Sequence, residues 1–164
     1  MRAAQYGVRG RIYSALESLT DVKVADLQAI FYGARPAGNR TWLIGNGGGA
    51  TTGDHFATDL LRCSDSEGRS VHATSLYSNI GAKTASGNSP NIIAAIAWAK
   101  DHSLTTIGLT GFDGGAARTQ VDVSVHVESA KGDYGVVEDA HLVACHMVAE
   151  ALREDQTPIH PSEG

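Results

Sequence analysis

Two histidines and two carboxylates stand at helical spacing in two separate stretches of the chain. His55 and Asp59 are four residues apart, so on a helix they share one face. Glu138 and His146 are eight residues apart, which turns a helix by about 80° beyond two full turns, so these two can also face the same way. Such a set could bind Zn²⁺ or a similar ion, or it could form an acid–base pair for proton transfer.

A glycine-rich loop follows a short apolar run at 41–44 and precedes a helical pattern. Its order, Gly45-Asn46-Gly47-Gly48-Gly49-Ala50, matches the G-x-G-x-x-A fingerprint of dinucleotide-binding proteins. That fingerprint also needs an acidic residue at the end of the next strand, and residues 75–79 contain none. We therefore expect no nucleotide cofactor and instead a site for a sugar or another anionic ligand, with a simple strand-to-helix turn as the alternative. The loop residues predicted to line this site are Asn46, Gly47, Gly48 and Gly49.

A second candidate ligand site is the stretch Ser86-Gly87-Asn88-Ser89-Pro90, which precedes an apolar helical pattern at 91–100. Ser89 is suited to cap this helix, and Pro90 is suited to be its first residue. Hydroxyls and free backbone N–H groups at the positive end of a helix dipole are typical of a phosphate site. Capping alone would explain Ser89, but capping is compatible with phosphate binding. The residues predicted to contact phosphate are Thr84, Ser86, Asn88 and Ser89.

These motifs lie among segments that alternate between strand and helix patterns. Helical spacing is seen at 3–32, after the glycine-rich loop, at 91–100 and at 134–153, and strand-like apolar runs are at 41–44, 71–77, 105–110 and 121–127. The alternation predicts an α/β fold of three layers, in which a doubly wound parallel sheet carries helices on both faces. Ligands of such sheets bind beyond the carboxyl ends of the strands, where the glycine-rich loop falls.

Length and composition predict one domain and exclude several classes of protein. The chain has 164 residues, of which 42% are hydrophobic and 19% are charged. The expected parts are N-terminal helices at 1–40, an α/β core at 41–153 and a mobile tail at 154–164. A net charge of −5 argues against nucleic-acid binding, and no apolar run approaches the roughly 18 residues that cross a membrane. Because the N-terminus has no apolar core of the signal-peptide type, we expect a cytoplasmic protein.

One connection is too short for the predicted sheet. Parallel strands need a crossover of about a dozen residues or more, but only 78–85 separate the strand at 71–77 from the serine-rich stretch. Either the sheet lacks a strand, or the natural chain contains a segment that is missing here. We favour the second explanation, with a break in the chain between residues 80 and 85.

Four motifs, in this order, resemble the sugar isomerase (SIS) domain of the phosphoheptose isomerase type. They are GNGGGATTGDHFATDL, TASGNSPNIIAAI, TTIGLTGFDGG and VEDAHLVACH, and the resemblance covers roughly residues 43–153. It implies a flavodoxin-like SIS fold and a homotetramer with active sites between subunits. The activity that it implies is the aldose–ketose isomerisation of sedoheptulose 7-phosphate to a heptose 7-phosphate through an enediol.

The resemblance also assigns roles to particular residues. Asp59 and His146 match the catalytic pair that passes protons, and the serines of the SGNS stretch match the phosphate-binding serines. Some members of the family bind zinc at the positions of His55, Asp59, Glu138 and His146, so one Zn²⁺ per site is expected.

The chain departs from the family pattern at several of these positions. Gly49 and Ala85 replace a serine and a threonine, Asp59 is one methylene shorter than the usual Glu, and Glu138 replaces Gln. A strand–helix unit that carries an active-site Asp in the family is absent near Ser78. The lost hydroxyls favour an alternative, a non-catalytic SIS module that binds a phosphosugar or has a regulatory role. The retained histidines and carboxylates favour the enzyme, which is the prediction.

Overall fold

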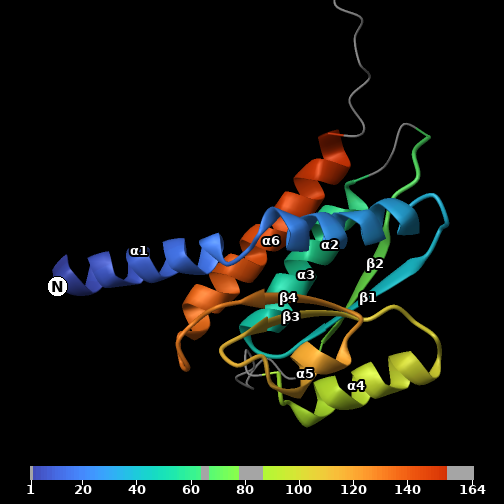
Figure 1. Ribbon diagram of the computed structural model, residues 1–164. Helices are drawn as coiled ribbons and strands as arrows, with labels where there is room; N and C mark the ends of the chain where they lie inside the picture. The colour runs from blue at the N-terminus through green and yellow to red at the C-terminus, as the bar shows by residue number, and fades with distance from the viewer. Residues whose placement is uncertain (1, 64–66, 78–86, 155–164) are drawn as a thin grey trace, which may run out of the picture.

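The computed structural model describes residues 2–63, 67–77 and 87–154, and its first two elements are helices. Helix α1 (Arg2–Glu17) projects from the body of the molecule, whereas α2 (Asp21–Ala34) lies across that body (Figure 1). The buried side chains of Leu27 and Phe31 join α2 to the core. Beyond the end of α2, Arg35 donates a hydrogen bond to the carbonyl of Leu152, 3.1 Å away, which fixes α2 against the end of α6. An N-terminal helical segment was predicted, and both helices fall within it.

The strands form two parallel pairs. Strand β1 (Arg40–Gly45) pairs with β2 (His72–Tyr77), and β3 (Ile107–Gly111) pairs with β4 (Val123–Val127). The parallel direction confirms the prediction from the alternating pattern. Among the described residues, however, the two pairs are separate two-stranded sheets, with no ladder between β1 and β3.

Helices cover both faces of these strands (Figure 1). On one face, α3 (Gly48–Leu61) packs on β1 and β2, and α6 (Tyr134–Glu154) contacts α3, β3 and β4. On the other face lie α4 (Pro90–Asp101) and α5 (Gly115–Gln120). The three-layer α/β prediction is therefore confirmed in its layers and its strand direction. The contact between α3 and α6 joins the two strand pairs.

The core lies between the strands and the layer of α2, α3 and α6. Phe56 and Leu60 of α3, Val125 of β4 and Val148 of α6 are all buried there. The ring of Phe56 meets that of Phe31 edge to face, with centroids 5.4 Å apart. Burial of apolar surface at about 25 cal/mol per Å² is the main term that holds these helices on the sheet.

Truncation of Leu60 tests this packing. Its side chain is fully buried at the centre of the core, where a shorter side chain leaves a cavity. We expect Leu60→Ala to lower the free energy of unfolding by about 2–5 kcal/mol. Leu61→Ala is the matched control because Leu61 is exposed on the same helix, and denaturant unfolding of the two variants measures the difference. Equal unfolding midpoints for the two variants would contradict the assignment of this core.

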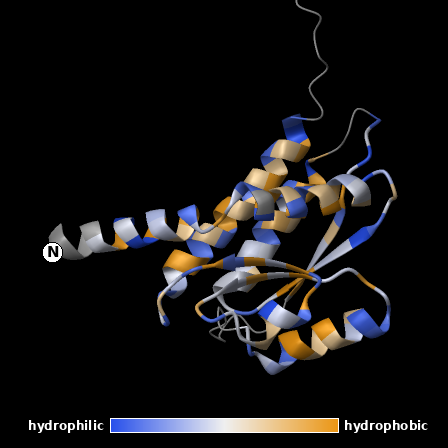
Figure 2. Ribbon diagram, in the orientation of Figure 1, coloured by the Kyte–Doolittle hydropathy of each residue, from blue (hydrophilic) through white to orange (hydrophobic). Residues whose placement is uncertain are grey.

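The opposite face of the β1–β2 pair is incompletely covered. Trp42, Ile44 and Leu76 lie on one face of the pair and remain exposed, with Trp42 at 48%. On α4 only Ile96 is classed as buried, whereas Trp98 is 58% exposed, and the helix is apolar along much of its length (Figure 2). This exposure is what a sheet short of one strand would show. The predicted chain break, between residues 80 and 85, lies outside the described residues.

Candidate active site

Helices α3 and α6 run side by side and bring two histidines together. The Nε2 atoms of His55 on α3 and His146 on α6 are 3.0 Å apart. Asp59, one turn further along α3, places Oδ2 3.3 Å from Nε2 of His55 and 3.8 Å from Nε2 of His146. The imidazoles are about half exposed, at 53% and 46%, whereas the side chain of Asp59 is only 11% exposed. The structure thus brings together three of the four predicted metal-site residues.

The three facing atoms of this histidine–aspartate cluster fit a metal ion. A tetrahedral ion at about 2.0–2.1 Å from nitrogen and oxygen ligands holds neighbouring ligand atoms about 3.3 Å apart. The three separations of 3.0, 3.3 and 3.8 Å lie around this value. His55, Asp59 and His146 could therefore hold a metal ion. Because both imidazoles are exposed, a further coordination position would face solvent.

Glu138 is not a member of the cluster. It lies eight residues before His146, which on a helix is about 12 Å along the axis. Its carboxylate instead accepts a hydrogen bond from the backbone N–H of Gly48, at the start of α3. Burial, and then the neighbouring Asp139, raise the pKa of Glu138, while the Gly48 amide lowers it. A Cβ at position 48 would overlap this carboxylate, so glycine leaves the space that Glu138 fills.

The glycine-rich loop turns from β1 into α3 as predicted. Gly47 is the N-cap of α3, with a positive φ of 52° that favours glycine. Asn46 is buried, and its side-chain amide exchanges two hydrogen bonds, of 3.0 and 2.8 Å, with that of Asn91 on α4. Asn46 therefore joins the glycine-rich loop to the first turn of α4. The two predicted ligand-binding stretches are neighbours in the fold.

The described part of the serine-rich stretch lies at the start of α4. Ser89 is the N-cap and Pro90 the first residue, as predicted, and the Ser89 hydroxyl makes no capping hydrogen bond. The side-chain oxygen of Asn88 accepts a hydrogen bond of 3.0 Å from the N–H of Ala116, so Asn88 holds the first turn of α5. Thr84 and Ser86 lie outside the described residues.

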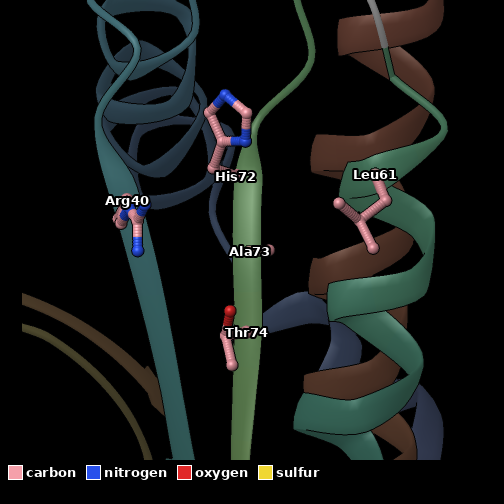
Figure 3. Close-up of a pocket in the computed structure, with 5 residues that line it drawn as sticks. All are labelled: Arg40, Leu61, His72, Ala73 and Thr74. Atoms are coloured by element: carbon pink, nitrogen blue, oxygen red, sulfur yellow. The ribbon is translucent and has the colours of Figure 1, made fainter.

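A shallow hollow of about 280 Å³ lies at the opposite end of β1 and β2 (Figure 3). Arg40, Leu61, His72, Ala73 and Thr74 line it. Arg40 and His72 are the first residues of their strands, whereas the glycine-rich loop follows the last residue of β1. Sequence reasoning attached no function to these residues, and none of the predicted site residues lies here.

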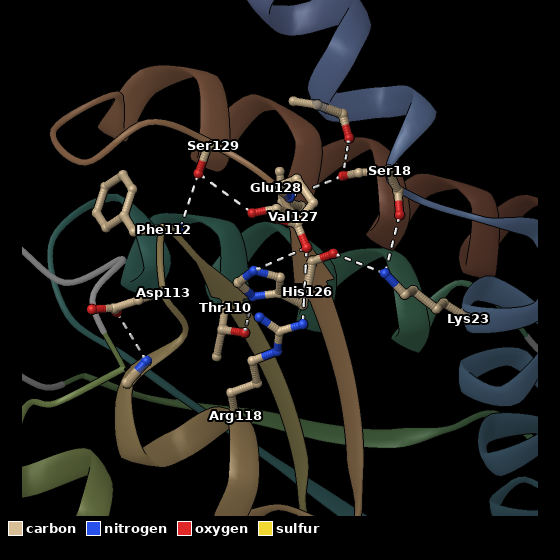
Figure 4. Close-up of polar contacts among 12 residues, drawn as sticks. Ser18, Lys23, Thr110, Phe112, Asp113, Arg118, His126, Val127, Glu128 and Ser129 are labelled. Carbon is tan, nitrogen blue, oxygen red and sulfur yellow. Dashed lines mark hydrogen bonds and ion pairs between the residues drawn. The ribbon is translucent and has the colours of Figure 1, made fainter.

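Two buried histidines, His126 and His141, lie outside the cluster and contact Thr110 of β3. His126 places Nδ1 2.9 Å from the hydroxyl of Thr110, and His141 places Nε2 3.2 Å from the carbonyl of the same threonine. Figure 4 shows His126 among Lys23, Glu128 and other polar neighbours. Burial, the larger cause in each case, lowers the pKa of both imidazoles, that of His141 to about 4. Both imidazoles are therefore neutral near pH 7.

Stability should therefore fall as the solution is acidified. Because the folded pKa of His141, about 4, is below the usual value of 6.5, the unfolded chain binds protons first. The stabilisation is present above pH 6.5 and is lost as the pH falls toward 4, on the order of 3 kcal/mol at most for this group. His141→Gln is expected to flatten the fall of the unfolding free energy across this window, and His102→Gln, an exposed control, is not. An unchanged slope in His141→Gln would contradict the assignment.

Comparison with known proteins places the chain in a family. No family model matches it. Among solved structures, the phosphoheptose isomerase GmhA from Neisseria gonorrhoeae superposes with a TM-score of 0.73 at 20% identity, covering 93% of this chain and 96% of that one. The phosphoheptose isomerase of Colwellia psychrerythraea is 30% identical over 148 residues, covering 70% of this chain and 74% of that protein. The chain belongs to the phosphoheptose isomerase family.

A second member of the phosphoheptose isomerase family shows how this chain differs in length. The enzyme of Geobacter sulfurreducens is 25% identical over 185 residues, covering 94% of this chain and 97% of that protein. This alignment is longer than the 164 residues of the chain, so the relative carries residues that this family member lacks. Residues missing from this chain would also explain the short connection at 78–85 and the separation of the two strand pairs.

Proposed function

We propose that this protein is a phosphosugar isomerase that interconverts sedoheptulose 7-phosphate and a heptose 7-phosphate. The observation that carries the proposal is the convergence of Oδ2 of Asp59 with Nε2 of His55 and of His146. Membership of the phosphoheptose isomerase family supports the reaction class. The alternative of a non-catalytic SIS module is not favoured, since the compared relatives are named as enzymes and the cluster is retained.

The reaction needs a group that takes a proton from carbon and a group that gives one to oxygen. Interconversion of an aldose and a ketose moves one proton between two adjacent carbons and one between their oxygens, through an enediol. Oδ2 of Asp59 would take the carbon-bound proton and return it to the neighbouring carbon. Nε2 of His146, 3.8 Å from Oδ2, would give a proton to the carbonyl oxygen and recover one from the adjacent hydroxyl. Histidine suits this part because its ordinary pKa lies near neutrality.

Zinc is the metal ion that we propose for the cluster. Two imidazole nitrogens and one carboxylate oxygen form a donor set that zinc enzymes commonly use, and His55, Asp59 and His146 would supply it. A bound Zn²⁺ would polarise the carbonyl oxygen of the sugar as a Lewis acid. Oδ2 of Asp59 and Nε2 of His146 cannot bind Zn²⁺ and carry a proton at the same time, so the metal and the proton-transfer roles are alternatives for these two atoms. The effect of metal removal on turnover decides between them. Glu138 stays at the glycine-rich loop rather than in the cluster.

For the phosphate group we propose the start of α4. The Ser89 hydroxyl, which makes no capping hydrogen bond, and the N–H groups of the first turn lie at the positive end of this helix. Thr84 and Ser86 remain proposed contacts, as do the backbone groups of Gly47, Gly48 and Gly49 for the sugar.

Homotetramer formation, with sites between subunits, and a cytoplasmic location also remain proposals. Within the described residues, no helix has the length and hydropathy needed to cross a membrane.

Turnover by the purified protein tests the proposal. Sedoheptulose 7-phosphate is incubated with the protein, and NMR follows the appearance of heptose 7-phosphate, with chelator, with added Zn²⁺ and with neither. We expect product, and a rate that the chelator lowers and Zn²⁺ restores would support a reaction that needs the metal. Product that is insensitive to chelator would support proton transfer without metal. No product, with broadening of the phosphate signal, would overturn the enzyme and support the binding module.

A further inference from the structure

We propose that Arg153 is a positioning residue that holds one oxygen of Asp59 so that only the other faces the two histidines. This inference rests on the proposed metal site in the histidine–aspartate cluster. Nη2 of Arg153 lies 3.4 Å from Oδ1 of Asp59, whereas Oδ2 is the atom that approaches His55 and His146. The two oxygens of one carboxylate therefore have different partners.

The guanidinium is itself held in place. Arg153 lies on the last turn of α6, seven residues after His146, a spacing that returns to the same helix face after two turns. Nη1 of Arg153 pairs with Oε1 of Glu150 on the same helix. Glu150 thus contacts one terminal nitrogen of the planar guanidinium, and Asp59 contacts the other.

This arrangement determines how Asp59 could bind an ion. A carboxylate can offer one oxygen or both to a metal, and groups that hold a ligand from outside fix which mode it adopts. With Oδ1 on the guanidinium, Asp59 offers Oδ2 alone, which keeps the three ligand atoms at the separations that fit a tetrahedral ion. Arg153 also balances the charge of a nearly buried carboxylate when no ion is bound.

A positive side chain near a cation also repels it. The side chain of Arg153 is 36% exposed, so water and salt screen this repulsion. Loss of a group that orients a metal ligand typically weakens metal binding by about 10–100-fold. We therefore expect orientation to outweigh repulsion, and removal of the guanidinium to weaken binding.

The test is Co²⁺ binding to metal-free protein, because Co²⁺ substitutes for Zn²⁺ and its visible absorption reports coordination number. We expect Arg153→Gln to bind Co²⁺ about tenfold more weakly than wild type, with a less intense spectrum as the freed Oδ1 joins the coordination shell. Arg153→Lys keeps a donor for Oδ1 and should retain the wild-type spectrum. Arg62→Gln, at the exposed end of α3, is the matched control and should bind as wild type does.

The outcomes separate this inference from the proposals on which it rests. Wild-type affinity and spectrum in Arg153→Gln would overturn the positioning role, even if the variant unfolds at a lower temperature. No saturable Co²⁺ signal in wild type would overturn the metal site together with this inference, while sugar turnover would still decide the isomerase.

Discussion

Asp59→Asn is expected to lower turnover of sedoheptulose 7-phosphate by about 10²–10⁴-fold, the range for loss of a positioned proton-transfer group. The amide has nearly the shape of the carboxylate but cannot take a proton from carbon. Phosphosugar affinity should change little, because the proposed phosphate contacts lie at the start of α4 rather than in the cluster. The expected result is therefore a large fall in kcat with a small change in substrate binding.

Asp54→Asn is the matched control for this variant. Asp54 is on the same helix and exposed, and the substitution is the same. Pre-steady-state turnover and a phosphosugar-induced shift in Tm, measured on both variants, separate catalysis from binding. Unchanged turnover in Asp59→Asn would remove Asp59 from the mechanism. Loss of binding and turnover together would assign it to substrate binding or folding.

His55→Ala is expected to weaken Zn²⁺ binding by more than about 100-fold. The substitution removes one of the three ligand atoms, whereas loss of Arg153 removes only a group that orients a ligand. The imidazole is half exposed and makes its closest polar contacts within the cluster, so the fold should survive its loss. Calorimetric titration of metal-free protein with Zn²⁺ measures the change. If Zn²⁺ is required, turnover should fall in the same variant and recover partly at high Zn²⁺.

His72→Ala controls for loss of any surface histidine. His72 lines the hollow at the amino ends of β1 and β2, outside the cluster. Wild-type affinity is expected for this variant. If His55→Ala and His72→Ala bind Zn²⁺ equally well, the cluster is not the metal site.

Helical periodicity predicted the half of the cluster that lies on one helix, and the family resemblance paired it with His146. His55 and Asp59 were expected on one face, and the structure places both of them against His146. The same reasoning failed to place Glu138, because periodicity does not say which residue of a neighbouring helix stands beside a given turn. Gly48 lies at the level of Glu138, and His55 lies at the level of His146.

Contacts between segments far apart in sequence were the other limit. Arg153 was missed. Its seven-residue spacing from His146 places the two on one face of a helix, but only the packing of α6 on α3 brings Arg153 to Asp59. Asn46 and Asn88 stay predicted ligand contacts, and their hydrogen bonds to other parts of the fold were not predicted from the sequence. By contrast, the four strands and the cap at Ser89 followed from local patterns alone. The short connection left two explanations open, a sheet short of one strand and a missing segment of chain, of which the second was favoured.

The separate strand pairs have a consequence for motion within the molecule. In the described part of the chain, β1, β2 and α3 form one half and β3, β4, α5 and α6 form another, with no strand ladder to couple them. We therefore expect each half to open by itself, so that amide hydrogen exchange reveals two protection levels rather than one. The α3–α6 contact is the boundary between the halves, and the cluster draws His55 and Asp59 from one and His146 from the other. An ion bound by the cluster would link the two halves, and the two protection levels should rise together as the ion binds.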